Sequence, residues 1–433
     1  MQLFAMGAQD VYLTGNPQIT FFKVVYRRHT NFSKECIAQQ FNGNPTFGSS
    51  VTCTLARNGD LVQEIYLRAV LKCTVDTDND YFRLEDVTSL IKTVEVEIGG
   101  QKIDKHYSQW LDIYNELFET SHDYRAVMNS GNGKIKKAVT AAASTATVSD
   151  PNNVGQDHQV VTAYVPLRFW FNRNPGLALP LIALQYHEVK ISTENLSEMW
   201  DKKMDDSTST EVNLSDLNLW CTYVYLDTDE RRRFAQVSHE YLIEQIQYTT
   251  VPASQNVELN FNHPVKELIW MFNVNGPVDF DKTKNYNGWA DTDTIGLQLN
   301  SQDRFAPRHP NYFSDWQVNQ YHTGFGKILL DDNDYTYSGG SGSDPGESHD
   351  NPKGRGDKCY RGDVYVYSFA LKPEEHQPSG TCNFSRIDSA TLQLLFTIGS
   401  NNITKHCNSL TVFAKNYNIL RIMSGMGGLA YSN

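Results

Sequence analysis

The acidic residues of this sequence resemble metal ligands in type but not in spacing. Residues 76–80 read Asp-Thr-Asp-Asn-Asp and begin like a calcium-binding loop, which supplies oxygen ligands at alternate positions. An EF-hand loop also needs glycine at its sixth position and glutamate at its twelfth. Tyr81 and Val87 occupy those positions, so we interpret the segment as a solvated acidic turn. The acidic runs at 291–293 and 331–334 receive the same interpretation.

The sequence also lacks the motifs of zinc, phosphate and nucleophile chemistry. Its twelve histidines include no H-x-x-x-H or H-E-x-x-H pair, the spacing of a helical zinc site. It contains no G-x-S-x-G motif and no Walker loop. The glycines of 424–428 lie too close to the C-terminus to precede the helix that a phosphate loop requires. We therefore predict no catalytic residue, no metal site and no cofactor, and we do not expect an enzyme.

Five Asn-x-Ser/Thr sequons provide candidate sites of glycosylation. Their asparagines are Asn31, Asn195, Asn213, Asn383 and Asn402. The first residues lack the charged and apolar regions of a secretory signal peptide, so the alternative is that all five are undecorated polar positions. The sequons leave both alternatives open.

Composition predicts a folded protein made mainly of strands. The 433 residues suit two domains, and 40% hydrophobic content is enough for their cores. The 23 Tyr and 21 Phe favour strands over helices. A net charge of −12 argues against a direct nucleic-acid partner, because neutralising phosphates needs a basic surface. Seven scattered cysteines without a C-x-x-C pair indicate reduced thiols, and no apolar run is long enough for a membrane-spanning helix.

Alternating apolar residues predict the strands of the first half. Residues 51–74 are expected to form two strands around a turn at 58–60. One face of the second strand carries Leu61, Ile65, Leu67, Ala69, Leu71 and Cys73. A strand at 93–98 ends at two glycines, and 107–118 has the apolar stripe of a helix. Further strands are expected at 19–26, 164–171, 183–191 and 218–226.

The second half is predicted to be equally rich in strands. They are expected at 241–248, 257–261, 267–274, 295–299, 364–369, 391–398 and 410–414. A charged run within 227–234 indicates a linker between the halves. Two segments rich in small or polar residues, 129–159 and 331–358, are predicted to be long surface loops.

Three matched patterns indicate that the two halves are copies of one β unit. Val62-Gln63-Glu64-Ile65 resembles a segment that begins 203 residues later, at Val265. The apolar pattern around 184–191 recurs at 387–394 with the same offset, and that of 94–101 recurs at 295–302. Three matches in the same order at nearly one offset favour a duplication.

These observations divide the chain into five parts. We predict an N-terminal arm (1–18), a first domain (19–226), a linker (227–236), a second domain (237–425) and a flexible C-terminal tail (426–433).

Four segments resemble a known family. Residues 7–32, GAQDVYLTGNPQITFFKVVYRRHTNF, are similar to the N-terminal signature of the major capsid proteins of large nucleocytoplasmic DNA viruses, the phycodnavirus and mimivirus group. Residues 259–270 (LNFNHPVKELIW), 377–388 (QPSGTCNFSRID) and 416–429 (NYNILRIMSGMGGL) resemble later parts of the same proteins. The similarity therefore brackets both halves of the chain.

The resemblance implies an all-β fold of two consecutive eight-stranded jelly rolls with a few short helices. It also implies a homotrimeric, pseudo-hexagonal capsomer in the outer icosahedral capsid of the virion, made and assembled in the host cytoplasm. The implied partners are neighbouring capsomers, minor capsid proteins, a penton protein and a nearby inner viral membrane, towards which the arm lies. Two alternatives stand beside it: a carbohydrate-binding β-sandwich using Tyr335 and Tyr337, and a β-rich hydrolase using Asp331 with Asp334.

Overall fold

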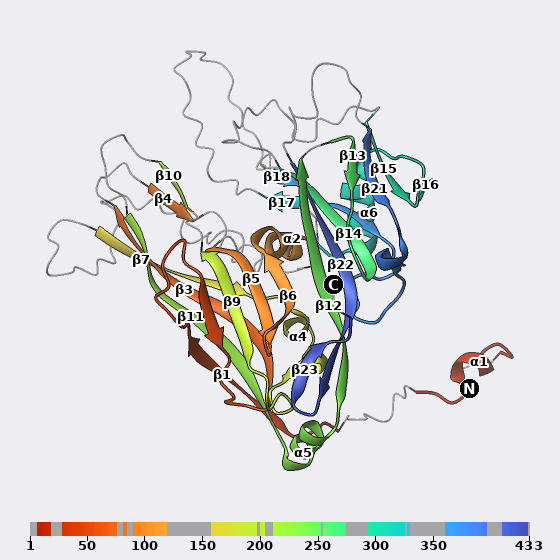
Figure 1. Cartoon of the computed structure of the whole chain (residues 1–433). Helices are drawn as coiled ribbons and strands as arrows, with labels where there is room; N and C mark the ends of the chain where they lie inside the picture. Colours follow the sequence, from red (N-terminus) through yellow and green to blue (C-terminus); the bar gives the residue numbers. More distant parts are fainter. Residues whose placement is uncertain are drawn as a thin grey trace, which may run out of the picture.

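A computed structural model shows two β-sandwiches standing side by side, with short helices between and beneath them (Figure 1). The first sandwich is formed by residues up to Leu226 and the second by residues from His239. The structure describes residues 7–18, 28–75, 81–84, 90–118, 157–196, 200–203, 211–252, 254–273, 293–324, 327–329, 360–395 and 409–431.

The first jelly roll consists of two four-stranded antiparallel sheets and a few accessory elements. One sheet has the order β1 (Phe32–Gln40), β11 (Glu211–Leu226), β3 (Leu61–Val75), β7 (Asp157–Pro166), with β8 (Leu179–Pro180) also paired to β3. The other has the order β2 (Val51–Thr54), β9 (Val189–Leu196), β5 (Ile91–Ile98), β6 (Gln101–Tyr107). The accessory elements are β4 (Tyr81–Leu84), β10 (Trp200–Lys203), α2 (Ser108–Phe118), α4 (Trp170–Arg173) and η3 (Pro175–Leu177).

The second jelly roll repeats this arrangement. Its first sheet has the order β12 (His239–Pro252), β22 (Ser409–Met423), β14 (Pro264–Asn273), β19 (Tyr365–Ser368), with β20 (Cys382–Asn383) also on β14. Its second has the order β13 (Asn256–Glu258), β21 (Ala390–Leu395), β15 (Thr294–Leu299), β16 (Gln302–Asp303). The remaining elements are η4 (Tyr312–Trp316), α6 (Gln317–Tyr321), β17 (Lys327–Leu329), β18 (Tyr360–Asp363) and η6 (Phe384–Arg386).

The strand orders confirm the predicted duplication. β3 and β14 occupy the same place in their sheets, as do β5 and β15, and β9 and β21. These are the three pairs of segments that the sequence patterns matched. Both β3 and β14 also carry a bulge where the matched segments begin, after Val62 and after Val265. An irregularity at the same register position is what two copies of one unit are expected to share.

Alternation along the strands builds a core for each sandwich. The predicted face of β3 is confirmed for Leu61, Ile65, Leu67, Ala69 and Leu71, which are all buried. The inner face of β14 carries Leu268 and Trp270, which pack into the separate core of the second jelly roll. Each fully buried aliphatic side chain contributes about 1.5–3 kcal/mol, so these two faces stabilise the sandwiches.

The turn at Gly99 and Gly100 explains why the strand predicted at 93–98 ends there. Both glycines have positive φ, +58° and +86°, a conformation that tight hairpins need and that side chains disfavour. The chain reverses and continues as β6, which the sequence patterns did not predict.

Several predicted boundaries are wrong. The strand expected at 164–171 ends at Pro166, whose ring nitrogen cannot donate to a ladder, and 170–173 form α4. Residues 183–188 precede β9 and are not in a strand, and the strand expected at 257–261 covers only 256–258. The two strands of 51–74 exist, but β2 and β3 belong to different sheets.

The two loop predictions and one strand prediction fall mainly outside the described residues. The strand expected at 19–26 lies there, as do the loop at 331–358 and most of the loop at 129–159. The last three residues of the loop expected at 129–159, residues 157–159, are instead the beginning of β7.

The predicted flexible tail is wrong for residues 426–429. They form β23 (Met426–Leu429), which pairs with β22 across a turn at Ser424 and Gly425. A Cβ atom on Gly427 would lie 2.7 Å from the side chain of Leu184 in the first jelly roll. The glycines of this segment therefore permit a close approach between strands, and they do not mark a free end.

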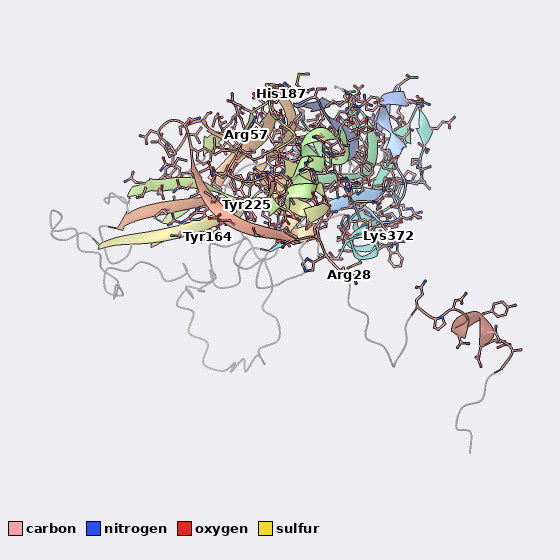
Figure 2. All side chains as sticks on the ribbon, turned by 90° about the horizontal axis from the view of Figure 1, so that it is seen from below. Arg28, Arg57, Tyr164, His187, Tyr225 and Lys372 are labelled. Carbon is pink, nitrogen blue, oxygen red and sulfur yellow. The ribbon has the colours of Figure 1, made fainter. Side chains whose placement is uncertain are left out.

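The connection and the arm are helical where the structure describes them. α5 (Thr228–Gln236) occupies the predicted linker, and the Asp227 side chain accepts a hydrogen bond from the first N–H of the helix. α1 (Val11–Thr14) stands apart from both sandwiches in two perpendicular views (Figures 1 and 2). Residues 11–13 are helical and exposed, so they do not add a strand to a sheet of the first jelly roll.

Candidate functional site

The two jelly rolls meet along a contact that we call the seam. It is formed by α2 and β6 of the first jelly roll against the outer face of sheet β12–β22–β14–β19. The predicted helix is confirmed, with α2 beginning one residue later than expected. Trp110, Ile113 and Leu117 recur at helical spacing and are 0% exposed. They pack against a sheet face that includes Ile269 and Phe413, also 0% exposed.

Stacked aromatic rings continue the seam beside α2. The rings of Tyr107 and Tyr248, from opposite jelly rolls, are stacked with centroids 4.1 Å apart. Phe413 lies 5.2 Å from Tyr248 and 5.6 Å from Trp110. Aromatic pairs at these distances contribute about 0.5–1.5 kcal/mol each beyond their buried area. The seam is therefore a packed interior surface.

Polar groups fix the register of β6 against β12. The Asp104 carboxylate accepts a hydrogen bond from the backbone N–H of Ile246 at 3.2 Å and lies 2.9 Å from His106 Nε2. The Gln245 side chain donates to the backbone oxygen of Ile103. These bonds satisfy buried backbone groups across the domain boundary, which apolar packing alone cannot do.

Glu244 is the centre of a buried group of charges at one end of the seam. Its carboxylate lies 2.6 Å from Lys266 Nζ, 2.7 Å from Arg173 Nη1 and 3.6 Å from Lys415 Nζ. Arg173 comes from the first jelly roll and the other groups from the second. Burial alone raises the pKa of Glu244, but Lys415, Arg173 and Lys266 outweigh it and lower the pKa to about 2.

Glu267 extends the same charge cluster toward α6. It is 0% exposed and lies 3.3 Å from Lys415 Nζ and 3.0 Å from His322 Nε2. Burial raises the pKa of Glu267, but Lys415 and His322 outweigh it and lower the pKa below its ordinary value. Burial lowers the pKa of His322, but Glu267 and Glu374 outweigh it, so the pKa is raised. We call Arg173, Glu244, Lys266, Glu267, His322, Glu374 and Lys415 the seam charge cluster.

Backbone oxygens and rings complete the surroundings of the two lysines. Lys266 Nζ donates to the backbone oxygen of Glu375 at 2.8 Å, and Lys415 Nζ donates to that of Pro373 at 3.1 Å. Lys415 Nζ also lies 4.4 Å from the ring centroid of Phe118, at the end of α2. Burial and Lys415 lower the pKa of Lys266 to about 8 against the opposite effect of Glu244.

The arrangement is suited to holding two domains together. With His322 neutral, the cluster contains three cations and three carboxylates, so its charges balance. Removing one partner of such a group leaves an uncompensated buried charge, which costs about 3–5 kcal/mol. The cluster therefore penalises any displacement of one jelly roll from the other.

The sequons do not gather at this site. Asn31 and Asn213 are exposed, and Asn383 is exposed while its side chain accepts a hydrogen bond from the backbone N–H of Ser385. Asn195 lies within β9, and Asn402 lies outside the described residues. The described sequons belong to different strands, because Asn31 immediately precedes β1, Asn213 lies in β11 and Asn383 lies in β20.

The other predicted chemistry is located as follows. The acidic runs at 76–80 and 331–334, and the tyrosines at 335 and 337, lie outside the described residues. Within the described part of the chain, no three His, Cys, Asp or Glu side chains are grouped to hold a metal ion.

In that part there is also no helix with the length and apolar character that crossing a bilayer requires. Cys36, Cys53, Cys221 and Cys382 are free thiols.

Sequence reasoning missed the seam charge cluster, although one signal was available. Lys266 and Glu267 are adjacent charges inside a strand that is otherwise apolar, and Lys415 interrupts the apolar run of β22. Charged residues are almost never fully buried unless they are paired. Three charges in two neighbouring central strands therefore indicate partners, but not which ones.

Two family models match the chain. The model described as "Major capsid protein N-terminus" matches residues 20–227. The model described as "Large eukaryotic DNA virus major capsid protein" matches residues 230–341 and 358–428. A "Major capsid protein" of Pyramimonas orientalis virus is 50% identical over 439 residues, covering 100% of this chain and 99% of the relative. This chain belongs to the major capsid proteins of large eukaryotic DNA viruses.

Other members of the family agree in sequence and in fold. The "Major capsid protein" of Paramecium bursaria Chlorella virus 1 is 41% identical over 490 residues, covering 100% of this chain and 99% of the relative. A chain of the "PBCV-1 virus capsid, quasi-atomic model" superposes with a TM-score of 0.70 at 36% identity, covering 96% of this chain and 100% of that one. The chain is a structural protein of the virion with the double jelly-roll fold of these capsid proteins.

Proposed function

We propose that three copies of this chain form a pseudo-hexagonal capsomer, and that such capsomers tile the icosahedral capsid of a large double-stranded DNA virus. The observation that carries the proposal is the duplication of one jelly roll within one chain, with the same strand order in both copies. Three chains then present six similar sides. A three-fold object with six similar sides can pack almost hexagonally in a lattice.

The seam supports this role because a lattice subunit needs a fixed angle between its two jelly rolls. Packed aromatic rings and a buried charge cluster oppose hinge motion between the domains. The capsomer then transmits force across six sides as one body. Related double jelly-roll chains with shell functions are expected to need the same rigidity.

The partners of the capsomer follow from its place in the shell. We infer neighbouring capsomers, minor capsid proteins and a penton protein as contacts, with the arm of residues 1–18 directed inward towards an internal membrane. The net charge of −12 favours a shell without direct contact to the genome. Assembly in the host cytoplasm fits the free thiols among the described residues.

The same proposal assigns the chain no reaction and no cofactor. Its buried charged groups pair with each other and with backbone oxygens, so they are occupied in holding the two jelly rolls together. Among the sequon asparagines whose side chains the structure describes, Asn31 and Asn213 are exposed candidates for capsid glycans, whereas Asn383 is exposed but its side chain caps η6. The mass of virion-derived chain, before and after glycosidase treatment, tests the glycans.

The native mass of the purified full-length chain tests the capsomer. We expect a species near three times 49.2 kDa by light scattering, with three-fold particles of hexagonal outline in electron micrographs. A monodisperse monomer over a wide range of concentrations would contradict the proposal. Hydrolase screens should find no turnover; activity abolished by one carboxylate substitution would contradict the assignment of a purely structural role.

A further inference from the structure

The turn between β22 and β23 carries an exposed apolar patch to which both jelly rolls contribute. Met423 and Met426 are paired across this turn, and each is more than half exposed. Tyr186 of the first jelly roll is 75% exposed, and its backbone N–H donates to the backbone oxygen of Gly425 at 3.0 Å. A Cβ atom on Gly425 would lie 2.6 Å from the Tyr186 ring, so the ring lies over the turn. We call Tyr186, Met423 and Met426 the hairpin patch.

Polar contacts across the domain boundary hold the hairpin patch in place. The backbone nitrogen of Gly427 lies 3.2 Å from His187 Nδ1, and the backbone N–H of Leu429 donates to Gln101 Oε1 at 3.2 Å. These contacts join β23 to β6 and to the segment before β9. Single exposed apolar residues are ordinary, whereas a group of them on a fixed support is typical of an interaction site.

The arm carries a second group of exposed apolar side chains. Val11, Tyr12 and Leu13 follow one another in α1, and each is more than half exposed. No element among the described residues covers them, and α1 lies beyond the edge of the second jelly roll in both views (Figures 1 and 2). A helix as short as α1 is not stable in water by itself, so it needs a surface on which to pack.

We propose that α1 of one copy of this chain binds the hairpin patch of an adjacent copy. The inference rests on the proposed capsomer, because it requires that copies meet, and it names the contact that the arm makes. Apolar side chains of both partners would leave water together, and burying one such side chain contributes about 1.5–3 kcal/mol. The two methionines suit this role because their unbranched side chains adapt to the shape of a partner.

The arm and the hairpin patch lie at the same end of the molecule. Phe32, the first residue of β1, pairs with Leu226 just before α5. His239, just after α5, pairs with Ile422 next to the hairpin patch. The arm therefore leaves each chain at the level at which an adjacent copy presents its own patch.

The length of the arm is sufficient for contact with another copy. α1 ends at Thr14, and β1 begins 18 residues later at Phe32. A chain extends by at most 3.3–3.6 Å per residue, so this segment spans at most about 60 Å. Each copy has one arm and one patch, so each can donate one contact and accept another. Such a heterologous contact leaves no arm without a partner when the ring of copies closes.

Cysteines placed on the two sides of the contact test it. One copy carries Leu13→Cys, and a co-expressed copy with a different tag carries Met426→Cys. Both have Cys36→Ser, because Cys36 is an exposed free thiol. A short bis-maleimide should give a species near twice 49.2 kDa on a denaturing gel. Mass spectrometry should find the tryptic peptide 1–23 joined to the peptide 422–433.

The matched control replaces Met426→Cys by Leu371→Cys. Leu371 is 78% exposed on the second jelly roll and lies outside the hairpin patch. The control pair should give no joined peptides, although both thiols react with a small maleimide. Joining in the control at the same yield would show that the arm has no preferred site.

Charge substitutions give an independent measurement. Leu13→Glu and Met426→Glu should each raise the concentration at which copies assemble roughly tenfold to a hundredfold, because each removes one apolar side chain from the contact. Leu13→Glu combined with Met426→Arg should recover most of the loss. Light scattering over a dilution series measures assembly, and a combined variant no better than Leu13→Glu alone would contradict the contact.

The outcomes separate this inference from the proposed function. A wild-type chain that stays monomeric contradicts both. A trimeric wild type whose cysteine variants react but are not joined contradicts the arm contact and leaves the capsomer standing. Joining found only when both cysteines are on the same copy assigns the patch to the chain's own arm and also contradicts the inference. Without joining, flotation of wild type with phosphatidylserine vesicles that Met426→Glu abolishes would identify a lipid surface as the occupant.

Discussion

The outer faces of the two equivalent sheets have the same strand order but opposite environments. In the first jelly roll Glu64 is exposed and Tyr66 is half-buried. At the corresponding positions of the second, Glu267 and Ile269 are both 0% exposed under α2. Water solvates the exposed carboxylate of Glu64, whereas the buried carboxylate of Glu267 needs a positive partner inside the protein. Lys415 supplies a positive charge to Glu267, and His322 pairs with the same carboxylate. Covering a duplicated surface therefore required new charge pairing as well as new apolar residues.

The largest expected difference between the two faces concerns these equivalent glutamates. Glu267→Gln should lower the free energy of unfolding by about 3–5 kcal/mol, because it leaves Lys415 buried with less compensation. Glu64→Gln is the matched control and should change it by no more than about 0.5 kcal/mol. Urea unfolding of both full-length variants measures the difference. Equal effects would show that burial in the seam does not distinguish the two positions.

The two tryptophans of the corresponding helical segments provide a second comparison. Trp110→Ala removes a fully buried ring from the seam and should cost about 3–5 kcal/mol. We expect calorimetry to resolve two transitions for this variant, because the seam loses a fully buried ring that packs between the two jelly rolls. Trp316→Ala should leave the unfolding of the chain nearly unchanged, since Trp316 is 63% exposed. A single unshifted transition for Trp110→Ala would show that the seam does not couple the domains.

Acid should weaken the seam through Glu244. Its pKa is lowered from 4.5 to about 2, so its contribution to stability is complete above pH 4.5 and is lost as the pH falls towards about 2. That shift corresponds to roughly 3 kcal/mol. Unfolding wild type and Glu244→Gln across this range should show a difference that is largest near neutral pH and vanishes at the acid end. A difference independent of pH would contradict the ionic role of Glu244.

His322 should act in the opposite direction at higher pH. Its pKa is raised by Glu267 and Glu374, so its contribution is complete below 6.5 and is lost as the pH rises through the raised value. The cluster is therefore expected to be most effective at weakly acidic pH. In a plot of the free energy of unfolding against pH, His322→Gln should remove the loss of stability at higher pH. The loss at acid pH, which is due to Glu244, should remain.

The smallest effect on stability is expected at the arm. Deleting residues 1–14 removes α1, whose side chains are all exposed, so the melting temperature should remain unchanged. Trimer or lattice formation should weaken, because the arm has no partner within its own chain among the described residues. Thermal melting and native mass separate the two effects. A large fall in the melting temperature would show that the arm stabilises the first jelly roll. A truncated chain that assembles normally would show that the arm has no role in the shell.

The sequence by itself determined the repeated unit, the inner faces of its strands and the helix at the seam. These are patterns with a period of two or of 3.6 residues, and each is readable within one segment, as for Leu67 to Leu71 in β3 or Trp110 to Leu117 in α2. The offset of 203 residues then related whole segments of the two halves. Two copies of one fold have their strands in the same order along the chain, and corresponding strands bury the same face.

Only the tertiary structure decided which outer face is covered and how its charges are paired. Arg173 and Glu244 lie 71 residues apart in different jelly rolls, and no local pattern relates them. The same holds for β23, whose glycines resemble a flexible end until Leu184 and Ile98 are seen packed against Gly427. An ion pair or a close strand contact depends on distance in space, whereas alternation records only the direction in which each side chain points from its own strand.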